Sequence, residues 1–167
     1  MIKLEKPDID VASIITDCTA NLTKQPILTH INASKTTIVS KSEKYNELAE
    51  KGQLGTLETH TMIEGGATKD DMVWLYDNKF VADGGRKYYD KIKAIPKYSK
   101  CPFCGVGIVS TLDHYLPKTK YPTYALTPVN LIACCADCNK NKKSEISETR
   151  NNEFIHPYYD EIGRAHV

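Results

Sequence analysis

Apolar residues recur at helical spacing along the first half of the chain. The clearest stretch covers residues 9–22, where they follow steps of three and four, as expected of a helix with one buried face. Pro7 and Asp8 are helix-start signals before this stretch, and Pro26 lies beyond its end. The apolar positions are Ile9, Ala12, Ile15, Cys18 and Leu22.

Weaker patterns predict three more helices before residue 96. An amphipathic stretch covers about residues 38–48 and stops at Gly52. Thr68 and Asp71 have the spacing of a capping box, in which each side chain bonds a free backbone N–H at a helix start. A basic helix is predicted over residues 86–95, between a Gly-Gly break and Pro96. Residues 1–95 are therefore expected to form a helical N-terminal region.

The pattern changes after the basic helix. Residues 107–112 form a short run with several β-branched side chains, which predicts a strand that carries Asp113 and His114 at its end. A proline-rich loop over residues 115–128 precedes a second strand over 131–134 and a short helix from 136 to about 144. The expected fold class is α+β, with this strand–loop–strand–helix unit in a second region over residues 96–160.

Length and composition limit the kind of protein. A chain of 167 residues is long enough for one globular unit with a proper core. No stretch approaches the roughly 20 apolar residues that span a bilayer. The N-terminus mixes acidic and basic residues without a long apolar run, so it does not resemble a signal peptide. We therefore expect a cytoplasmic protein whose thiols stay reduced.

Four of the six cysteines form two CxxC pairs. Each pair can supply two thiolates from one tight turn, so the spacing predicts a structural zinc site with four sulfur ligands. Redox-active pairs are the alternative, but no thioredoxin-like βαβ pattern surrounds them. The other two cysteines are predicted to be small buried hydrophobes. The pairs are Cys101 with Cys104 and Cys135 with Cys138, and the remaining cysteines are Cys18 and Cys134.

Positive charge is concentrated around these cysteines. Residues 84–143 carry eleven Lys or Arg against three Asp, a balance of +8, whereas residues 1–83 sum to −4 and 144–167 to −3. The net charge of the chain is only +1. A basic block of this kind favours contact with phosphate, although an ordinary solvated lysine-rich face is the alternative.

Further polar residues lie inside this cysteine frame and directly after it. Asp113-His114 is followed by Pro117, Asn130 precedes the second pair, and Asn139 follows Cys138 at once. In this order and spacing the pattern resembles the HNH endonucleases, nucleases with a ββα-metal active site. The resemblance covers about a quarter of the chain, and residues 156–160 look like a downstream segment of some members. It implies that residues 96–160 form a zinc-stabilised ββα-metal (HNH) nuclease core.

The resemblance also implies a role for each polar residue. His114 is expected to be the general base, since imidazole titrates near neutral pH. Asp113 and Asn139 would supply oxygen ligands to a catalytic Mg²⁺ or Mn²⁺. Asn130 is expected to join the loop through backbone hydrogen bonds and to hold the base in position. A zinc ion with four thiolates has no open position, so Zn²⁺ would stabilise the fold and the catalytic cation would be separate.

Other polar side chains have less specific signals. Lys142 lies three residues after Asn139, on the same face of the predicted helix, and would contact phosphate. Lys118 and Lys120 would do likewise from the loop, and a plain surface role is the alternative for all three. His156 is either a further active-site group or a packing or capping residue.

The remaining histidines are given no function. His30 and His60 have no partner pattern around them. His166 lies in residues 161–167, which resemble one reading frame of a sequencing adapter and are predicted to be a non-native tail.

The sequence therefore predicts metal-dependent cleavage of nucleic acid phosphodiester bonds, with DNA as the expected partner. One alternative is a zinc-ribbon module that binds nucleic acid without cutting it. Another is an effector of a defence or mobile-element system that acts with a protein partner. The set of Asp113, His114 and Asn139 favours cleavage, because binding alone does not need these three residues.

Overall fold

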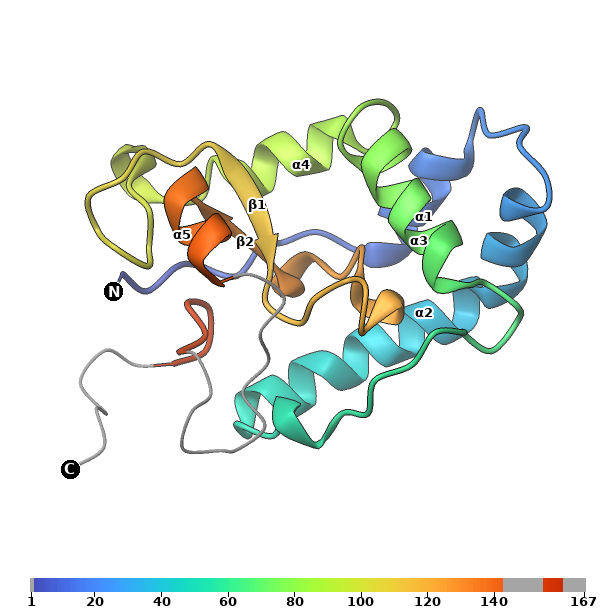
Figure 1. The fold of residues 1–167 in the computed structure, drawn as a ribbon, viewed down its shortest axis with the longest axis horizontal. Helices are drawn as coiled ribbons and strands as arrows, with labels where there is room; N and C mark the ends of the chain where they lie inside the picture. Colours follow the sequence, from blue (N-terminus) through green and yellow to red (C-terminus); the bar gives the residue numbers. More distant parts are fainter. Residues whose placement is uncertain (1, 143–154, 161–167) are drawn as a thin grey trace.

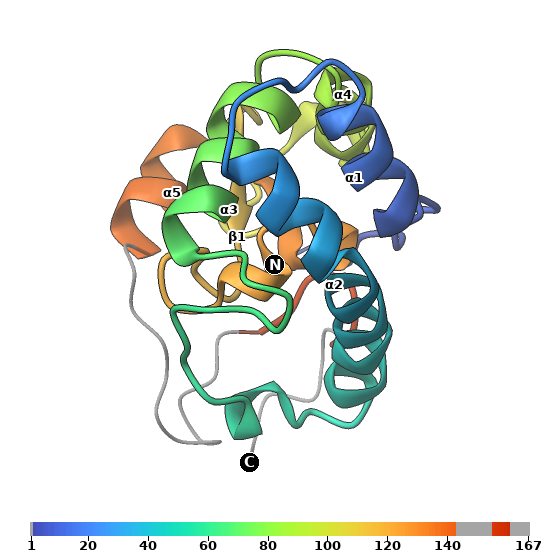
Figure 2. The same cartoon turned by 90° about the vertical axis from the view of Figure 1, so that its right-hand side faces the viewer.

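A computed structural model of the protein describes residues 2–142 and 155–160, and in these ranges the fold is α+β. Helices α4 and α5 both contact the small sheet, and the long helix α2 runs along the loop that joins the two strands (Figure 1). A view turned by 90° shows α1 and α3 beside the first turns of α2 (Figure 2). The helices are α1 (Val11–Thr19), α2 (Ile27–Glu50), α3 (Lys69–Leu75), α4 (Arg86–Lys93) and α5 (Ala136–Lys142), and the strands are β1 (Thr111–His114) and β2 (Leu131–Cys134). Short 3-10 turns occur at Leu54–Thr56, Lys97–Ser99, Pro122–Tyr124 and Pro128–Asn130, and a π-helical turn at Tyr76–Phe80.

The first predicted helix is confirmed, although it begins later than its start signals. Asp10, not Pro7 or Asp8, is the N-cap of α1, and its carboxylate accepts from the backbone N–H groups of the next turn. The capping box of Thr68 and Asp71 at the start of α3 is confirmed. The basic helix is also confirmed as α4, which ends two residues before its predicted limit.

Helix α2 is about twice as long as predicted. The sequence pattern indicated only its second half, because serines occupy part of its buried face. Ser34 is fully buried and its hydroxyl accepts from the Ala67 backbone N–H, while the Ser42 hydroxyl bonds that of Thr127 at 2.6 Å. Small hydroxyl side chains thus stand where an apolar pattern would place isoleucine or leucine, and they bring α2 close to its neighbours.

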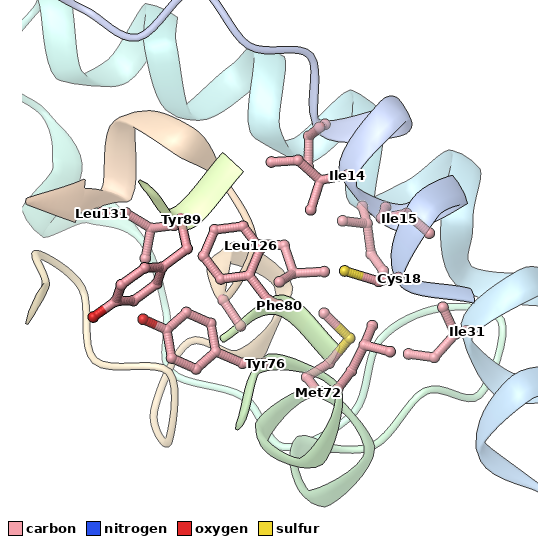
Figure 3. Packing of buried hydrophobic residues seen from close by; sticks show 14 of the residues in the cluster. Ile14, Ile15, Cys18, Ile31, Met72, Tyr76, Phe80, Tyr89, Leu126 and Leu131 are labelled. Carbon is pink, nitrogen blue, oxygen red and sulfur yellow. The ribbon is translucent and has the colours of Figure 1, made fainter. Parts of the chain in front are cut away.

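The core joins the helical region to the predicted nuclease region. Figure 3 shows Ile14, Ile15 and Cys18 of α1 packed with side chains of α2 and α3 and with Leu126 and Leu131 from the second region. A second cluster places Leu4 and Tyr45 against residues 116–132 and Tyr158. Both clusters contain side chains from either side of residue 95, so the two regions pack as one unit.

The two strands form an antiparallel pair in which Asp113 faces Ile132 and His114 faces Leu131 across the ladder. Strand β2 and the start of α5 agree with the prediction. Strand β1 ends with Asp113 and His114, as predicted, but it begins only at Thr111, and residues 107–110 precede it. Residues 107 and 108 instead pair with residues 100 and 101 around the first CxxC pair.

None of the described helices is long and apolar enough to cross a membrane. The stretch predicted to be a non-native tail, residues 161–167, lies outside the described residues.

Candidate functional site

The four cysteines of the two CxxC pairs meet at one point. Their sulfur atoms all lie within 4.8 Å of one another, and those of Cys104 and Cys135 are 4.0 Å apart. A tetrahedral zinc ion with bonds of about 2.3 Å would place its sulfur ligands about 3.8 Å apart. The cluster is therefore compatible with one structural metal ion such as zinc.

Backbone turns shape the first half of this cluster. Gly105 has a φ of +71°, which suits glycine, and its N–H donates to the Cys101 carbonyl. A Cβ on Gly107 would lie 2.8 Å from the side chain of Cys135, so a larger residue cannot fit there. The Gly107 N–H donates to the Cys104 sulfur at 3.3 Å. That hydrogen bond is the main reason why the pKa of Cys104 falls to about 6, which favours the thiolate form that binds metal.

The two remaining cysteines are buried, as predicted. Cys18 lies in the main core and Cys134 lies beside Cys101 and Cys135. Burial raises the pKa of each thiol to about 12, so both stay protonated at neutral pH.

A cleft of about 630 Å³ lies between β1, the loop after it and α5. It brings together three of the residues that the sequence singled out, Asp113 and His114 from β1 and Asn139 from α5. Lys118 and Lys140 also line it, so cations stand at its rim beside the carboxylate, imidazole and amide groups. This arrangement offers oxygen and nitrogen atoms to a small ligand or ion.

The ring of His114 is fixed in one orientation. Its Nε2 lies 3.0 Å from the Ala125 carbonyl oxygen, which can only accept, so Nε2 carries the proton and Nδ1, which bonds none of the described residues, is unprotonated. The Tyr76 ring packs edge-on against the imidazole with centroids 4.5 Å apart. Burial lowers the pKa of His114 to about 3, and the side chain is therefore neutral at physiological pH.

Asp113 is paired with Lys142, and this corrects the prediction that Lys142 faces phosphate. The lysine is buried, and its ammonium donates to Asp113 Oδ2 at 2.8 Å and to the carbonyls of His114 and Tyr115. Burial raises the pKa of Asp113, an effect that the lysine opposes. Lysine at the third position after Asn139 points inward because a buried carboxylate needs a counter-charge.

Asn130 is buried and joins two parts of the loop between the strands. Its Oδ1 accepts from the Leu116 N–H at 2.7 Å, and its Nδ2 donates to the carbonyls of Leu116 and Tyr124. Tyr124 precedes Ala125, whose carbonyl holds His114. The side chain of Asn130 therefore lies one residue away from the group that orients the imidazole.

Sequence reasoning missed Tyr45 as a part of this network. Its hydroxyl is fully buried on α2, donates to Asn130 Oδ1 at 3.1 Å and lies 3.1 Å from His156 Nε2. His156 is buried among tyrosines and does not line the cleft, so it has a packing role. Burial lowers the pKa of His156 to about 3. No sequence signal marks Tyr45, because a tyrosine on the inner face of a helix is usually a core residue.

Three other side chains have partners that the sequence did not indicate. His30 Nδ1 lies 2.9 Å from the Asp71 carboxylate, and His60 Nε2 lies 2.6 Å from the Thr123 hydroxyl. Lys118 pairs with Asp77 and lies over the Tyr76 ring. Lys120 is exposed, as a phosphate contact or a surface residue would be.

Comparison with known proteins finds a likeness to a phage protein. No protein-family model matches the chain, and no solved structure matches it significantly. The chain is similar to Protein ea31 of Escherichia phage lambda, with 31% identity over 170 residues. The matched segment covers 96% of this chain and 57% of the phage protein, so the chain spans little more than half the length of that relative.

Proposed function

We propose that the protein is a metal-dependent endonuclease that hydrolyses phosphodiester bonds of nucleic acid, with DNA as the expected substrate, by chemistry of the HNH type. The observation that carries the proposal is the cleft, where an oriented neutral imidazole lies beside a carboxylate and an amide. His114 has an unprotonated Nδ1, and Asp113 and Asn139 are side chains of the same cleft. These groups match the general base and the oxygen ligands that hydrolysis of a phosphodiester requires.

Two metals with different roles fit this proposal. The four thiolates suit a structural Zn²⁺, because they leave no open position for a substrate. Asp113 and Asn139 would hold the catalytic cation, and their hard oxygen atoms favour Mg²⁺ or Mn²⁺. In this structure Lys142 neutralises Asp113, so a cation bound at this carboxylate would have to share the carboxylate with the ammonium or displace the ammonium.

The low pKa of His114 limits what the imidazole can do alone. A base with a pKa of about 3 is always unprotonated at neutral pH, but it accepts a proton weakly. A divalent cation in the cleft would lower the pKa of water and so reduce the demand on the base. His114 would then need only to orient the water and remove its proton, with Ala125 holding the ring in place.

Cleavage of supercoiled plasmid in Mg²⁺ or Mn²⁺ tests the proposal. The comparison includes wild type, His114→Ala, Asn139→Ala and Thr119→Ala, a substitution of an exposed residue that lines the same cleft. We expect cutting by wild type and Thr119→Ala and at least a 100-fold loss in the other two variants, with zinc content and melting temperature of Asn139→Ala unchanged. Equal cutting by all four proteins would remove the assigned roles, and no cutting by any would remove the proposal.

A second candidate is a module that binds nucleic acid without cutting it. The ion pair between Lys142 and Asp113 favours it, because the carboxylate is already satisfied without a metal. Salt-sensitive DNA binding by wild type, together with no cleavage at any Mg²⁺ or Mn²⁺ concentration, would support this candidate.

A further inference from the structure

Exposed apolar side chains gather around the first CxxC pair. Four of the six large hydrophobic residues that are exposed in the described part of the chain lie here. The Ile2 N–H donates to the Pro102 carbonyl, and residue 100 forms a bridge with residue 108, so the four side chains belong to one end of the molecule. Figure 1 shows this loop in yellow, projecting beyond α5 near the N-terminal segment. The knuckle surface, as we name it, consists of Ile2 (39% exposed), Tyr98 (91%), Val106 (75%) and Ile108 (60%).

The backbone holds Tyr98 outward in an unfavourable conformation. Tyr98 and Ser99 have φ values of 55° and 53°, and they are the non-glycine residues with positive φ in the described ranges. Hydrogen bonds fix this turn, from the Ser99 N–H to Pro96 and from the Val109 N–H to the Ser99 carbonyl. The Tyr98 ring has no ring or cation partner among the described residues. A strained turn that presents a large aromatic ring to solvent is a feature of binding sites more often than of packing.

Lysines without acidic partners surround this surface. Residues 91–110 contain four lysines and no Asp or Glu. Lys97 is exposed, and the Lys100 ammonium donates only to the Val106 carbonyl among the described residues. Neither forms an ion pair with a described carboxylate. The surface therefore combines an exposed aromatic ring, aliphatic side chains and free positive charge.

We propose that the knuckle surface binds unpaired bases of single-stranded nucleic acid, with Tyr98 stacked on a base and Lys97 and Lys100 near the phosphates. The combination of a basic surface and an exposed aromatic ring matches single-strand binding sites. The core of a protein interface is usually poor in lysine, which argues against a protein partner. This inference shares the ligand class of the proposed function but does not depend on cleavage.

The position of the surface suits a strand that continues into the cleft. Ile108 lies five residues before Asp113, and an extended chain of that length spans about 17 Å. Ile108, a member of the knuckle surface, therefore lies no more than about 17 Å along the chain from Asp113.

Fluorescence anisotropy with a labelled single-stranded oligonucleotide, without added divalent cation, tests the proposal. The variants are Tyr98→Ala, Tyr98→Phe and Met62→Ala, the last an exposed apolar residue elsewhere on the chain. Stacking on one base predicts binding about 5- to 100-fold weaker for Tyr98→Ala and near wild type for Tyr98→Phe and Met62→Ala. A duplex of the same sequence should bind Tyr98→Ala and wild type equally. Lys97→Gln should reduce the salt dependence of binding by about one phosphate contact.

Several results would overturn the inference. Equal affinity of wild type and Tyr98→Ala for the single strand would remove the stacking role. An equal loss for duplex and single strand would remove the preference for unpaired bases, and no measurable single-strand binding by wild type would remove the surface as a site. Because no cleavage is measured, each result is independent of whether the protein cuts DNA.

Discussion

Replacing Tyr45 by phenylalanine removes a single hydroxyl from the centre of the buried polar network. That hydroxyl donates to Asn130 Oδ1 and lies at hydrogen-bond distance from His156 Nε2. Since the hydroxyl proton is used on Asn130, His156 donates to it through an Nε2–H. The ring of Tyr45 and its packing against Tyr124 stay in place, so the substitution changes only the two hydrogen bonds.

Each of the two partners loses one hydrogen bond. Asn130 Oδ1 still accepts from the Leu116 N–H, so its loss is one neutral hydrogen bond, about 1 kcal/mol. The buried His156 ring also has a hydrogen bond to the Val129 backbone, so losing the hydroxyl costs it one neutral hydrogen bond, about 1 kcal/mol. We therefore expect the free energy of unfolding to fall by roughly 2 kcal/mol, or about a 30-fold change in the unfolding equilibrium.

Urea unfolding measured by circular dichroism checks this value. Tyr124→Phe is the matched control, because its ring lies in the same cluster and its hydroxyl bonds none of the described residues. The control should lose less than about 0.5 kcal/mol. If the two variants unfold at the same urea concentration, the Tyr45 hydroxyl does not stabilise the loop and our account of the network is wrong.

Four further predictions follow from the site. Removing metal with a chelator should unfold the region around the four cysteines and lower the melting temperature, because the binding free energy of a structural metal is part of the folding free energy; unchanged melting and circular dichroism would exclude a structural metal. Asn130→Ala should cost about 3 kcal/mol of stability and at least tenfold in any cleavage rate, and a variant with wild-type stability would refute its role in joining the loop. Lys142→Met should destabilise the fold by about 3–5 kcal/mol, since it leaves the buried Asp113 carboxylate unpaired, and added Mg²⁺ should restore part of that loss. Urea unfolding curves with and without Mg²⁺ would measure both effects, and a stability identical to that of wild type would contradict the buried pair. Stability should also fall as pH decreases from about 6.5 toward 3, because His114 and His156 have folded pKa values of about 3 and are protonated first in the unfolded chain. The raised pKa of Asp113 has the opposite effect on stability, but it is one group against two. A flat stability profile between pH 7 and 4 would refute the buried neutral state of the histidines.

Local patterns were enough to predict several elements of the fold. The capping box of α3, strand β2, the start of α5 and the meeting of the four cysteines all depend on residues close together in the sequence or on a spacing with one chemical meaning. The start of β1 could not be placed, since the β-branched run before it pairs instead with the residues at the first CxxC pair. The first half of α2 was missed because its inner face carries serine, which the apolar pattern reads as polar.

The candidate site, like the fold, could be predicted from the sequence only in part. Sequence order placed Asp113, His114 and Asn139 in one unit, and the structure brings them to one cleft. It did not show that Lys142 turns inward to Asp113, or that Tyr45 reaches Asn130 and His156 across 85 and 111 positions of the chain. Contacts of that separation depend on the tertiary fold, and neither spacing nor periodicity in one sequence carries them.

The large distance in sequence between these residues also sets the order in which the buried polar network can form during synthesis. Helix α2 emerges from the ribosome long before its partners, and Tyr45 meets Asn130 and then His156 only after most of the chain has been made. Residues 155–160 contact both early and late parts of the described chain, with the Leu4 N–H donating to the Pro157 carbonyl and Tyr158 donating to the Leu131 carbonyl. A nascent chain that stops before residue 155 therefore carries Asp113, His114 and Asn139 without the contacts that complete the surrounding loop. Translation thus delays these contacts to the loop until residues 155–160 have been added.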